Sequence, residues 1–284
     1  MPLAGTAAGA AAGAGAGKSA SAVALGALEC RALWVSVPGG PRLATVDVAL
    51  QPGRLTAILG PNGAGKSTLL SLLSGQSRPL GGQVRLGGQA LGHYSAAQLA
   101  LVRAVMPQEN TVAFDFSVQE VVEWGRFAHR SAPSQNEGAI ALQALQATGV
   151  AHLALRNINT LSGGERARVH LARALAQLWE PRPDGAARWL LLDEPTAALD
   201  LSHQHQAMAL LRLWAEEQGV GVVAVLHDLN LALRYAHDVL LLEGGRCQFG
   251  PVADTLCQDT IARVWQVDCT AVPAQDGVLQ YLFA

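Results

Sequence analysis

A glycine-rich loop of nine residues constrains this chain more than any other feature of its sequence. The loop consists of Gly60, Pro61, Asn62, Gly63, Ala64, Gly65, Lys66, Ser67 and Thr68. It follows the apolar run Leu55–Leu59, which predicts a buried strand, and it leads into Ser67–Ser74, which predicts a helix. The pattern G-x-x-x-x-G-K-[ST] in this setting is typical of a phosphate-binding loop, because backbone N–H groups and a helix N-terminus face the anion. We therefore expect Lys66 to reach the phosphates of a nucleotide such as ATP, and Ser67 to offer its hydroxyl to Mg²⁺.

Short apolar runs and helix-like stretches alternate along the rest of the chain. Further strands are predicted at Trp189–Leu192, Val220–Leu226 and Val239–Leu242. These runs are continuous rather than alternating, as in parallel strands that are buried on both faces. Helices are predicted at Ser117–Phe127, Ser162–Leu178 and Leu201–Gln218. Strands that alternate with helices indicate an α/β fold with a parallel sheet.

Composition excludes several other classes of protein. Half of the 284 residues are hydrophobic and only 15% are charged, so the chain is not disordered overall. The net charge of −2 gives no basic footprint for nucleic acid, and no apolar run approaches the length of a membrane span. The four cysteines have no paired spacing, which favours reduced thiols. Residues 1–27 are mostly Ala and Gly and are expected to form a disordered tail, with the folded domain at 28–284.

Two carboxylates follow one of the predicted buried strands. Asp193 and Glu194 come directly after Trp189–Leu192, at the carboxyl end, where α/β sheets place their ligands. We expect Asp193 to hold Mg²⁺ and Glu194 to polarise the attacking water as a general base.

A third motif lies between the glycine-rich loop and the pair Asp193 and Glu194 in the sequence, and it points to a family. Leu161 is followed by Ser162, Gly163, Gly164 and Glu165, so a Ser-capped helix with two glycines exposes N–H groups at its start. This stretch resembles the signature motif of the ABC ATPases. The resemblance implies a P-loop NTPase fold: a RecA-like parallel-sheet core, an antiparallel β subdomain and an inserted α-helical subdomain at about 109–178. It also implies a head-to-tail homodimer, in which this helix faces the γ-phosphate held by the other subunit. Gln is commoner than Glu165 in the family, and we expect Glu165 to cap the helix.

Other family elements follow in the expected order. The resemblance implies that Gln108 contacts Mg²⁺ and water, that Asp200 reaches across the dimer, and that His227 acts at the γ-phosphate. The family also stacks an aromatic residue on adenine. No aromatic lies at Val35–Val37, where it belongs, and Trp34 is the nearest candidate; an ordinary core or edge-strand position is the competing interpretation.

Within the family, a single ATPase unit without membrane helices is typical of a transporter's separate ATP-binding subunit. A soluble ABC ATPase not tied to transport remains the alternative from another class. The stretches Ser95–Gln108, Phe116–Val122 and Leu199–Gln206 are similar to iron-chelate and vitamin B12 importers, and most of all to haemin importers. This resemblance implies two permease subunits, a periplasmic haem-binding protein and a place on the cytoplasmic face of the bacterial inner membrane. Ferric siderophore or cobalamin import is the alternative. His203 and His205 do not share a helix face, which argues against a haem ligand pair.

Overall fold

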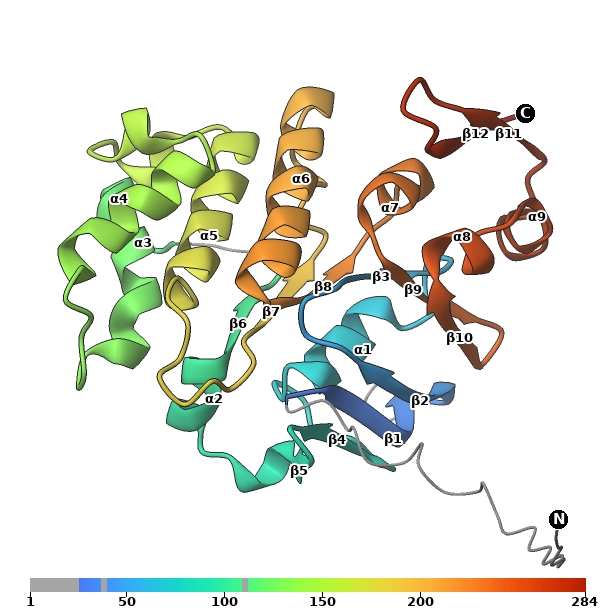
Figure 1. The fold of residues 1–284 in the computed structure, drawn as a ribbon, viewed down its shortest axis with the longest axis horizontal. Helices are drawn as coiled ribbons and strands as arrows, with labels where there is room; N and C mark the ends of the chain where they lie inside the picture. Colours follow the sequence, from blue (N-terminus) through green and yellow to red (C-terminus); the bar gives the residue numbers. More distant parts are fainter. Residues whose placement is uncertain (1–25, 37–39, 109–111) are drawn as a thin grey trace, which may run out of the picture.

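The computed structural model describes residues 26–36, 40–108 and 112–284, which are built around a six-stranded, mostly parallel sheet (Figure 1). In spatial order its strands are β10 (Arg246–Pro251), β9 (Asp238–Glu243), β3 (Leu55–Leu59), β8 (Gly221–Val225), β7 (Trp189–Asp193) and β6 (Arg103–Met106). Only the edge strand β10 is antiparallel to its neighbour. Every residue of β3, β7 and β8 is buried, as the continuous apolar runs require. The predicted parallel sheet is therefore confirmed.

A second, antiparallel sheet shares an apolar cluster with the first sheet and with α1 (Lys66–Leu73). Its strands are β2 (Arg42–Leu50), β1 (Leu28–Ser36), β4 (Gln83–Leu86) and β5 (Gln89–Ala90), in that order. A separate hairpin, β11 (Cys269–Pro273) and β12 (Leu279–Phe283), ends the chain. The antiparallel component implied by the family resemblance is thus present.

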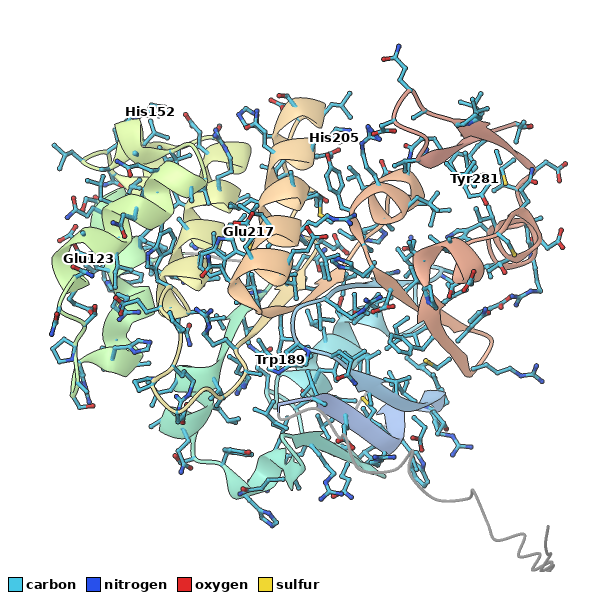
Figure 2. All side chains as sticks on the ribbon, viewed as in Figure 1. Glu123, His152, Trp189, His205, Glu217 and Tyr281 are labelled. Carbon is cyan, nitrogen blue, oxygen red and sulfur yellow. The ribbon has the colours of Figure 1, made fainter. Side chains whose placement is uncertain are left out.

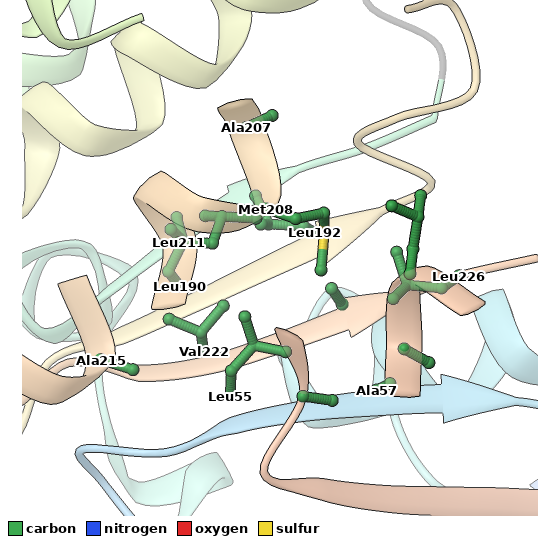
Figure 3. Packing of buried hydrophobic residues seen from close by; sticks show 14 of the residues in the cluster. Leu55, Ala57, Leu190, Leu192, Ala207, Met208, Leu211, Ala215, Val222 and Leu226 are labelled. Atoms are coloured by element: carbon green, nitrogen blue, oxygen red, sulfur yellow. The ribbon is translucent and has the colours of Figure 1, made fainter. Parts of the chain in front are cut away.

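Both faces of the parallel sheet are covered. Successive residues of a strand point to opposite faces, so β3, β7, β8 and β9 each contribute to two apolar clusters. Leu190 and Leu192 join one apolar cluster with α6 (Leu201–Gln218) and α7 (Leu229–Tyr235), part of which Figure 3 shows. Leu191 joins another cluster, which α1 (Lys66–Leu73) shares with the antiparallel sheet. The helix α1 is therefore held between two sheets, and the loop that precedes it is fixed from both sides.

Helices α3 (Val118–Glu123), α4 (Glu137–Ala147) and α5 (Gly163–Gln177) lie together at one side of the molecule (Figure 1), and their buried side chains share a third apolar cluster. Helix α5 also contributes Leu171 and Leu175 to the cluster that α6 and α7 form with the parallel sheet, so it joins the two clusters. The division into an inserted subdomain at 109–178 within 28–284 stays a prediction. The remaining helices are α2 (Ala96–Val102), α8 (Val252–Thr255) and α9 (Gln258–Trp265).

The predicted tail at 1–27 falls mostly outside the described residues. Its last two residues already contact the fold, because the Trp189 indole donates to Gly26 O over 2.9 Å and Gly87 N donates to Ala27 O. Packing against the domain therefore begins by Gly26. No helix within the described ranges combines the length and apolar character needed to span a bilayer.

Candidate active site

The glycine-rich loop leaves the end of β3 and turns sharply into α1. Gly60 and Gly65 have φ angles of +148° and +96°. A Cβ on Gly60 would lie 2.3 Å from Leu242 O, and one on Gly65 would lie 2.8 Å from Val35 Cγ1. Glycine is therefore required at both positions, because the backbone passes too close to the neighbouring strands for any side chain.

Lys66 is the first residue of α1, and its side chain folds back over the loop. Its Nζ donates to Gly60 O over 2.9 Å and to Pro61 O over 3.1 Å, and the residue is buried. Burial lowers the pKa of Lys66, while the charges of Glu194 and Asp193 act in the opposite direction. The loop thus holds an ammonium group at its centre, with two carboxylates near it.

Asp193 ends β7 beside the start of α1. Ser67 Oγ donates to Asp193 Oδ1 over 3.1 Å, and burial raises the pKa of this carboxyl. A hydroxyl and a carboxylate in contact are oxygen ligands of the kind that Mg²⁺ prefers, so the residues fit that ion. The described ranges contain no group of three or more His, Cys, Asp or Glu side chains suited to a metal ion.

Glu194 is held between side chains from two neighbouring strands. Gln108 Nε2 donates to its Oε2 over 3.0 Å, and His227 Nε2 lies 2.6 Å from its Oε1. Gln108 follows β6 and His227 follows β8, and these strands flank β7 in the sheet. The backbone of Glu194 has a φ angle of +51°, which strains a residue with a side chain. The strand order therefore gathers three predicted site residues at the carboxyl ends of β6, β7 and β8.

The signature stretch makes its hydrogen bonds within its own helix cap. Ser162 N and Oγ both donate to Glu165 Oε2 over 2.8 Å, and Glu165 N donates to Ser162 Oγ. These bonds lower the pKa of Glu165, which caps the helix as expected. A Cβ on Gly164 would lie 3.1 Å from Ala198 O, so this helix start abuts the segment that leads to Asp200.

Asp200 likewise caps its own helix, α6. Its carboxylate accepts from His203 N and lies 2.8 Å from His203 Nδ1, and its side chain is 66% exposed. The hydrogen bonds of Ser162, Glu165 and Asp200 thus stay within their own helix caps. In contrast, the side chains of Gln108, Asp193 and His227 make their bonds at the carboxyl ends of the parallel strands. His205 instead lies 2.9 Å from Tyr235 Oη, so the two histidines do not form a pair.

Trp34 does not face the glycine-rich loop. Its neighbour Val35 lies against Gly65, whereas the Trp34 indole points to the opposite face of β1, where it packs on Gly81 under the guanidinium of Arg42. The stacking candidate therefore fails, because side chains alternate along a strand.

Two cavities adjoin the loop, and each is lined partly by residues outside the predicted motifs. A cavity of about 270 Å³ is lined by Leu43, Pro61, Asn62, Gly63, Ala64, Glu243, Gly244 and Gly245. Another, of about 350 Å³, is lined by Gly60, Pro61, Asn62, Leu226, His227, Val264, Trp265 and Gln266. The last three residues come from the C-terminal part of the chain, which carries no recognisable motif.

Comparison with known proteins places these features in a family. The ABC transporter family model matches residues 43–197. The hemin import ATP-binding protein HmuV of Gloeobacter violaceus is 50% identical over 77% of this chain and 79% of its own length. HmuV of Myxococcus xanthus is 46% identical over 89% of this chain and 95% of its own.

Solved structures agree with this assignment. A metal-chelate type ABC transporter in an inward-facing conformation has a chain that is 28% identical, with a TM-score of 0.75 over 91% of this chain and 98% of that one. A dimeric ATP-binding cassette bound to ADP and Pi is 27% identical, with a TM-score of 0.68 over 79% of this chain and 98% of that one. The α/β sheet, the glycine-rich loop and these matches lead to one conclusion: the chain belongs to the ABC transporter family, as one of its nucleotide-binding ATPase subunits.

Proposed function

We propose that this chain hydrolyses ATP to drive haemin uptake through two separate permease subunits, on the cytoplasmic face of a bacterial inner membrane. A periplasmic haem-binding protein would deliver the substrate from the far side. The observation that carries the ATPase part is the position of Glu194, which contacts both Gln108 and His227 beside the Lys66 loop. Haemin as the cargo is supported by the names of the related import proteins.

In this proposal the loop Gly60–Thr68 wraps the phosphates of ATP. Backbone N–H groups and the N-terminus of α1 would face the anion, which favours negative charge. The Lys66 ammonium would exchange its bonds to Gly60 O and Pro61 O for phosphate oxygens. The burial of Lys66 strengthens this contact, because a charge interacts more strongly where water is excluded.

Ser67, Asp193 and Gln108 are the proposed holders of Mg²⁺. Gln108 uses Nε2 to reach Glu194, so its Oε1 is the atom that would face the cation. The ion, when bound, supplies positive charge that offsets negative charge on the phosphate oxygens.

Glu194 would accept a proton from the attacking water, and His227 would hold the Glu194 carboxylate in place while facing the γ-phosphate. Because a carboxylate only accepts, the 2.6 Å contact requires an N–H on His227 Nε2 when Glu194 is ionised. This N–H is present both in the neutral Nε2–H tautomer and in the imidazolium of His227.

Each site would be completed by a second copy of the chain. Ser162, Gly163, Gly164 and Glu165 would present the N-terminus of α5 to the ATP held by the partner, and Asp200 would reach across the interface. Three observations support this. The hydrogen bonds of Ser162 and Glu165 run within their own helix cap rather than to Gln108, Glu194 or His227. The Asp200 side chain is exposed, and a dimeric ATP-binding cassette resembles this chain.

Growth of a deletion strain on haemin, beside growth on ferric siderophores, tests the cargo. Loss of growth on haemin alone, restored by the wild-type gene and not by Glu194→Gln, is the expected result. Unchanged growth on haemin with loss on a siderophore would overturn haemin and favour ferric siderophore import, in line with the resemblance to a metal-chelate type transporter. A purified chain without Mg²⁺-dependent ATP hydrolysis would overturn the ATPase itself.

A further inference from the structure

The C-terminal hairpin is bonded to the helix that follows His227. Helix α7 begins two residues after His227, and Asp228 caps it by accepting from Asn230 N and Leu231 N. Only seven residues long, α7 is too short to be stable by itself and depends on what it packs against. His227 therefore lies between the end of β8 and the start of α7, and its position depends in part on what holds α7.

Asn230 makes the central contact between α7 and the hairpin. Its Nδ2 donates to Tyr281 O over 3.0 Å, and its Oδ1 accepts from Tyr281 N over 2.7 Å. One carboxamide thus pairs with both backbone groups of a single residue, as a neighbouring strand would. Two bonds to one residue fix orientation as well as distance.

On the hairpin side of this contact, Tyr281 is buried and hydrogen-bonded. Tyr281 is 4% exposed, its Oη donates to Leu256 O over 2.8 Å, and Figure 2 labels it within the C-terminal part of the fold. At the other end of α7, Arg234 forms an ion pair of 2.7 Å with Asp276 in the hairpin turn. Helix α7 is thus attached to the hairpin at both of its ends.

The same C-terminal part also contacts the site from another direction. Trp265 and Gln266 at the end of α9 line the cavity of about 350 Å³ whose other wall contains His227. The backbone of Gln266 has a φ angle of +55° and so shares the left-handed region with Glu194. The C-terminal part of the chain therefore contacts α7 through the hairpin and lines the cavity beside His227 through the end of α9, while supplying none of the predicted catalytic groups.

We propose that Asn230 is a positioning residue, which sets His227 against Glu194 by fastening α7 to the backbone of Tyr281. This inference rests on the proposed role of His227 in ATP hydrolysis. Without the two bonds, α7 would keep its N-cap but lose its alignment, so His227 would spend less time 2.6 Å from Glu194. The glycine-rich loop Gly60–Thr68 lies between β3 and α1 rather than on α7, so ATP binding would be little affected.

The test compares full-length Asn230→Ala with His227→Ala and with a matched control, Gln258→Ala. Gln258 Nε2 donates to Cys269 O over 2.9 Å, so the control also removes a carboxamide bond to the hairpin backbone, but from α9. We expect Asn230→Ala to lower kcat for MgATP about tenfold at an unchanged KM, as is usual for groups that orient a functional residue. Gln258→Ala should leave kcat unchanged.

A spectroscopic readout separates positioning from loss of stability. Nitrogen-15 NMR of the imidazole rings resolves the eight histidines, and the His227 signal is the one missing from His227→Ala. We expect this signal to shift in Asn230→Ala and to stay in place in Gln258→Ala. If Asn230→Ala folds poorly, Asn230→Asp serves instead, because it keeps the acceptor for Tyr281 N and replaces the donor to Tyr281 O by a carboxylate oxygen, which cannot donate.

The outcomes distinguish the two proposals. If His227→Ala hydrolyses ATP like the wild type, the role of His227 is wrong, and with it the mechanism under which Asn230 acts. If His227→Ala is impaired but Asn230→Ala keeps full kcat, or loses activity with an unmoved His227 signal, the positioning role alone is overturned.

Discussion

His227 Nε2 lies 2.6 Å from Glu194 Oε1, although the two residues are 33 positions apart in the chain. They meet because Glu194 directly follows β7 and His227 follows β8 after one intervening residue, and these adjacent parallel strands pair along their whole length. The contact holds the Glu194 carboxylate, the proposed general base, against His227, so substitutions at both positions test the proposed mechanism directly.

Glu194→Gln should stop turnover without preventing ATP binding. The amide keeps the shape of the side chain and loses the proton acceptor, so we expect hydrolysis to fall by about 100-fold or more. Binding is measured by titration with ATP, and association by sedimentation, where ATP should now hold the chain as a stable dimer. Glu217→Gln, an exposed position on α6, is the matched control and should behave like the wild type. Normal turnover in Glu194→Gln would remove Glu194 from the mechanism.

Gly65→Ala should be more damaging than Gly63→Ala, although both glycines have positive φ angles, +96° and +79°. A Cβ at 65 would lie 2.8 Å from Val35 Cγ1, whereas a Cβ at 63 meets nothing within 4 Å. We expect Gly65→Ala to lose about 1–3 kcal/mol of unfolding free energy from strain, plus a steric cost that Gly63→Ala avoids. Urea unfolding measures the difference, and equal losses would contradict the packing of Gly65 on β1.

Asp193→Asn should stabilise the apo chain at neutral pH and destroy its Mg²⁺-dependent activity. Burial raises the pKa of Asp193, so the ionised form is less stable in the folded state than in the unfolded state. The stability that this carboxyl contributes is complete below the unfolded pKa and is lost as pH rises through the raised folded pKa. Asn keeps an acceptor for Ser67 Oγ and never ionises.

The gain in melting temperature of Asp193→Asn should therefore be present at pH 7 and disappear on acidification toward the ordinary pKa of an aspartate. Thermal unfolding in EDTA without nucleotide, at a series of pH values, measures it. A gain that persists at low pH would show that charge burial is not its cause.

Ser162→Ala and Ser117→Ala separate helix capping from action across the dimer. Both residues form a capping box, with Glu165 and Glu120 respectively. Each substitution should cost about 1 kcal/mol of stability. Hydrolysis by the isolated chain should fall only for Ser162→Ala, because the start of α5 is proposed to face the partner's ATP. Equal activity in the two variants would argue against that placement.

Local patterns were enough to predict much of this protein. The runs that became β3 and β7 were recognised because a strand buried on both faces must be apolar throughout, and α6 lies at Leu201–Gln218 as predicted. The Ser162 and Ser117 caps were visible because a capping box involves only neighbours within one helical turn. The glycine-rich loop and the two carboxylates after β7 are equally local, so the sequence alone placed them on the correct elements.

Tertiary structure decided the rest, because pairing over long distances leaves no local trace. The strand β6 has only four residues and alternates in burial, so nothing in its sequence marks it as the partner of β7. The contact of Gln108 with Glu194, 86 positions apart, depends on that pairing. Trp34 failed as a stacking residue because strand alternation turns it away from Gly65, and Asn230 meets Tyr281 only because the C-terminal hairpin packs on α7. The sequence by itself predicted which residues are candidates for the chemistry; the order of the strands and the packing of the last hairpin decided which of them meet.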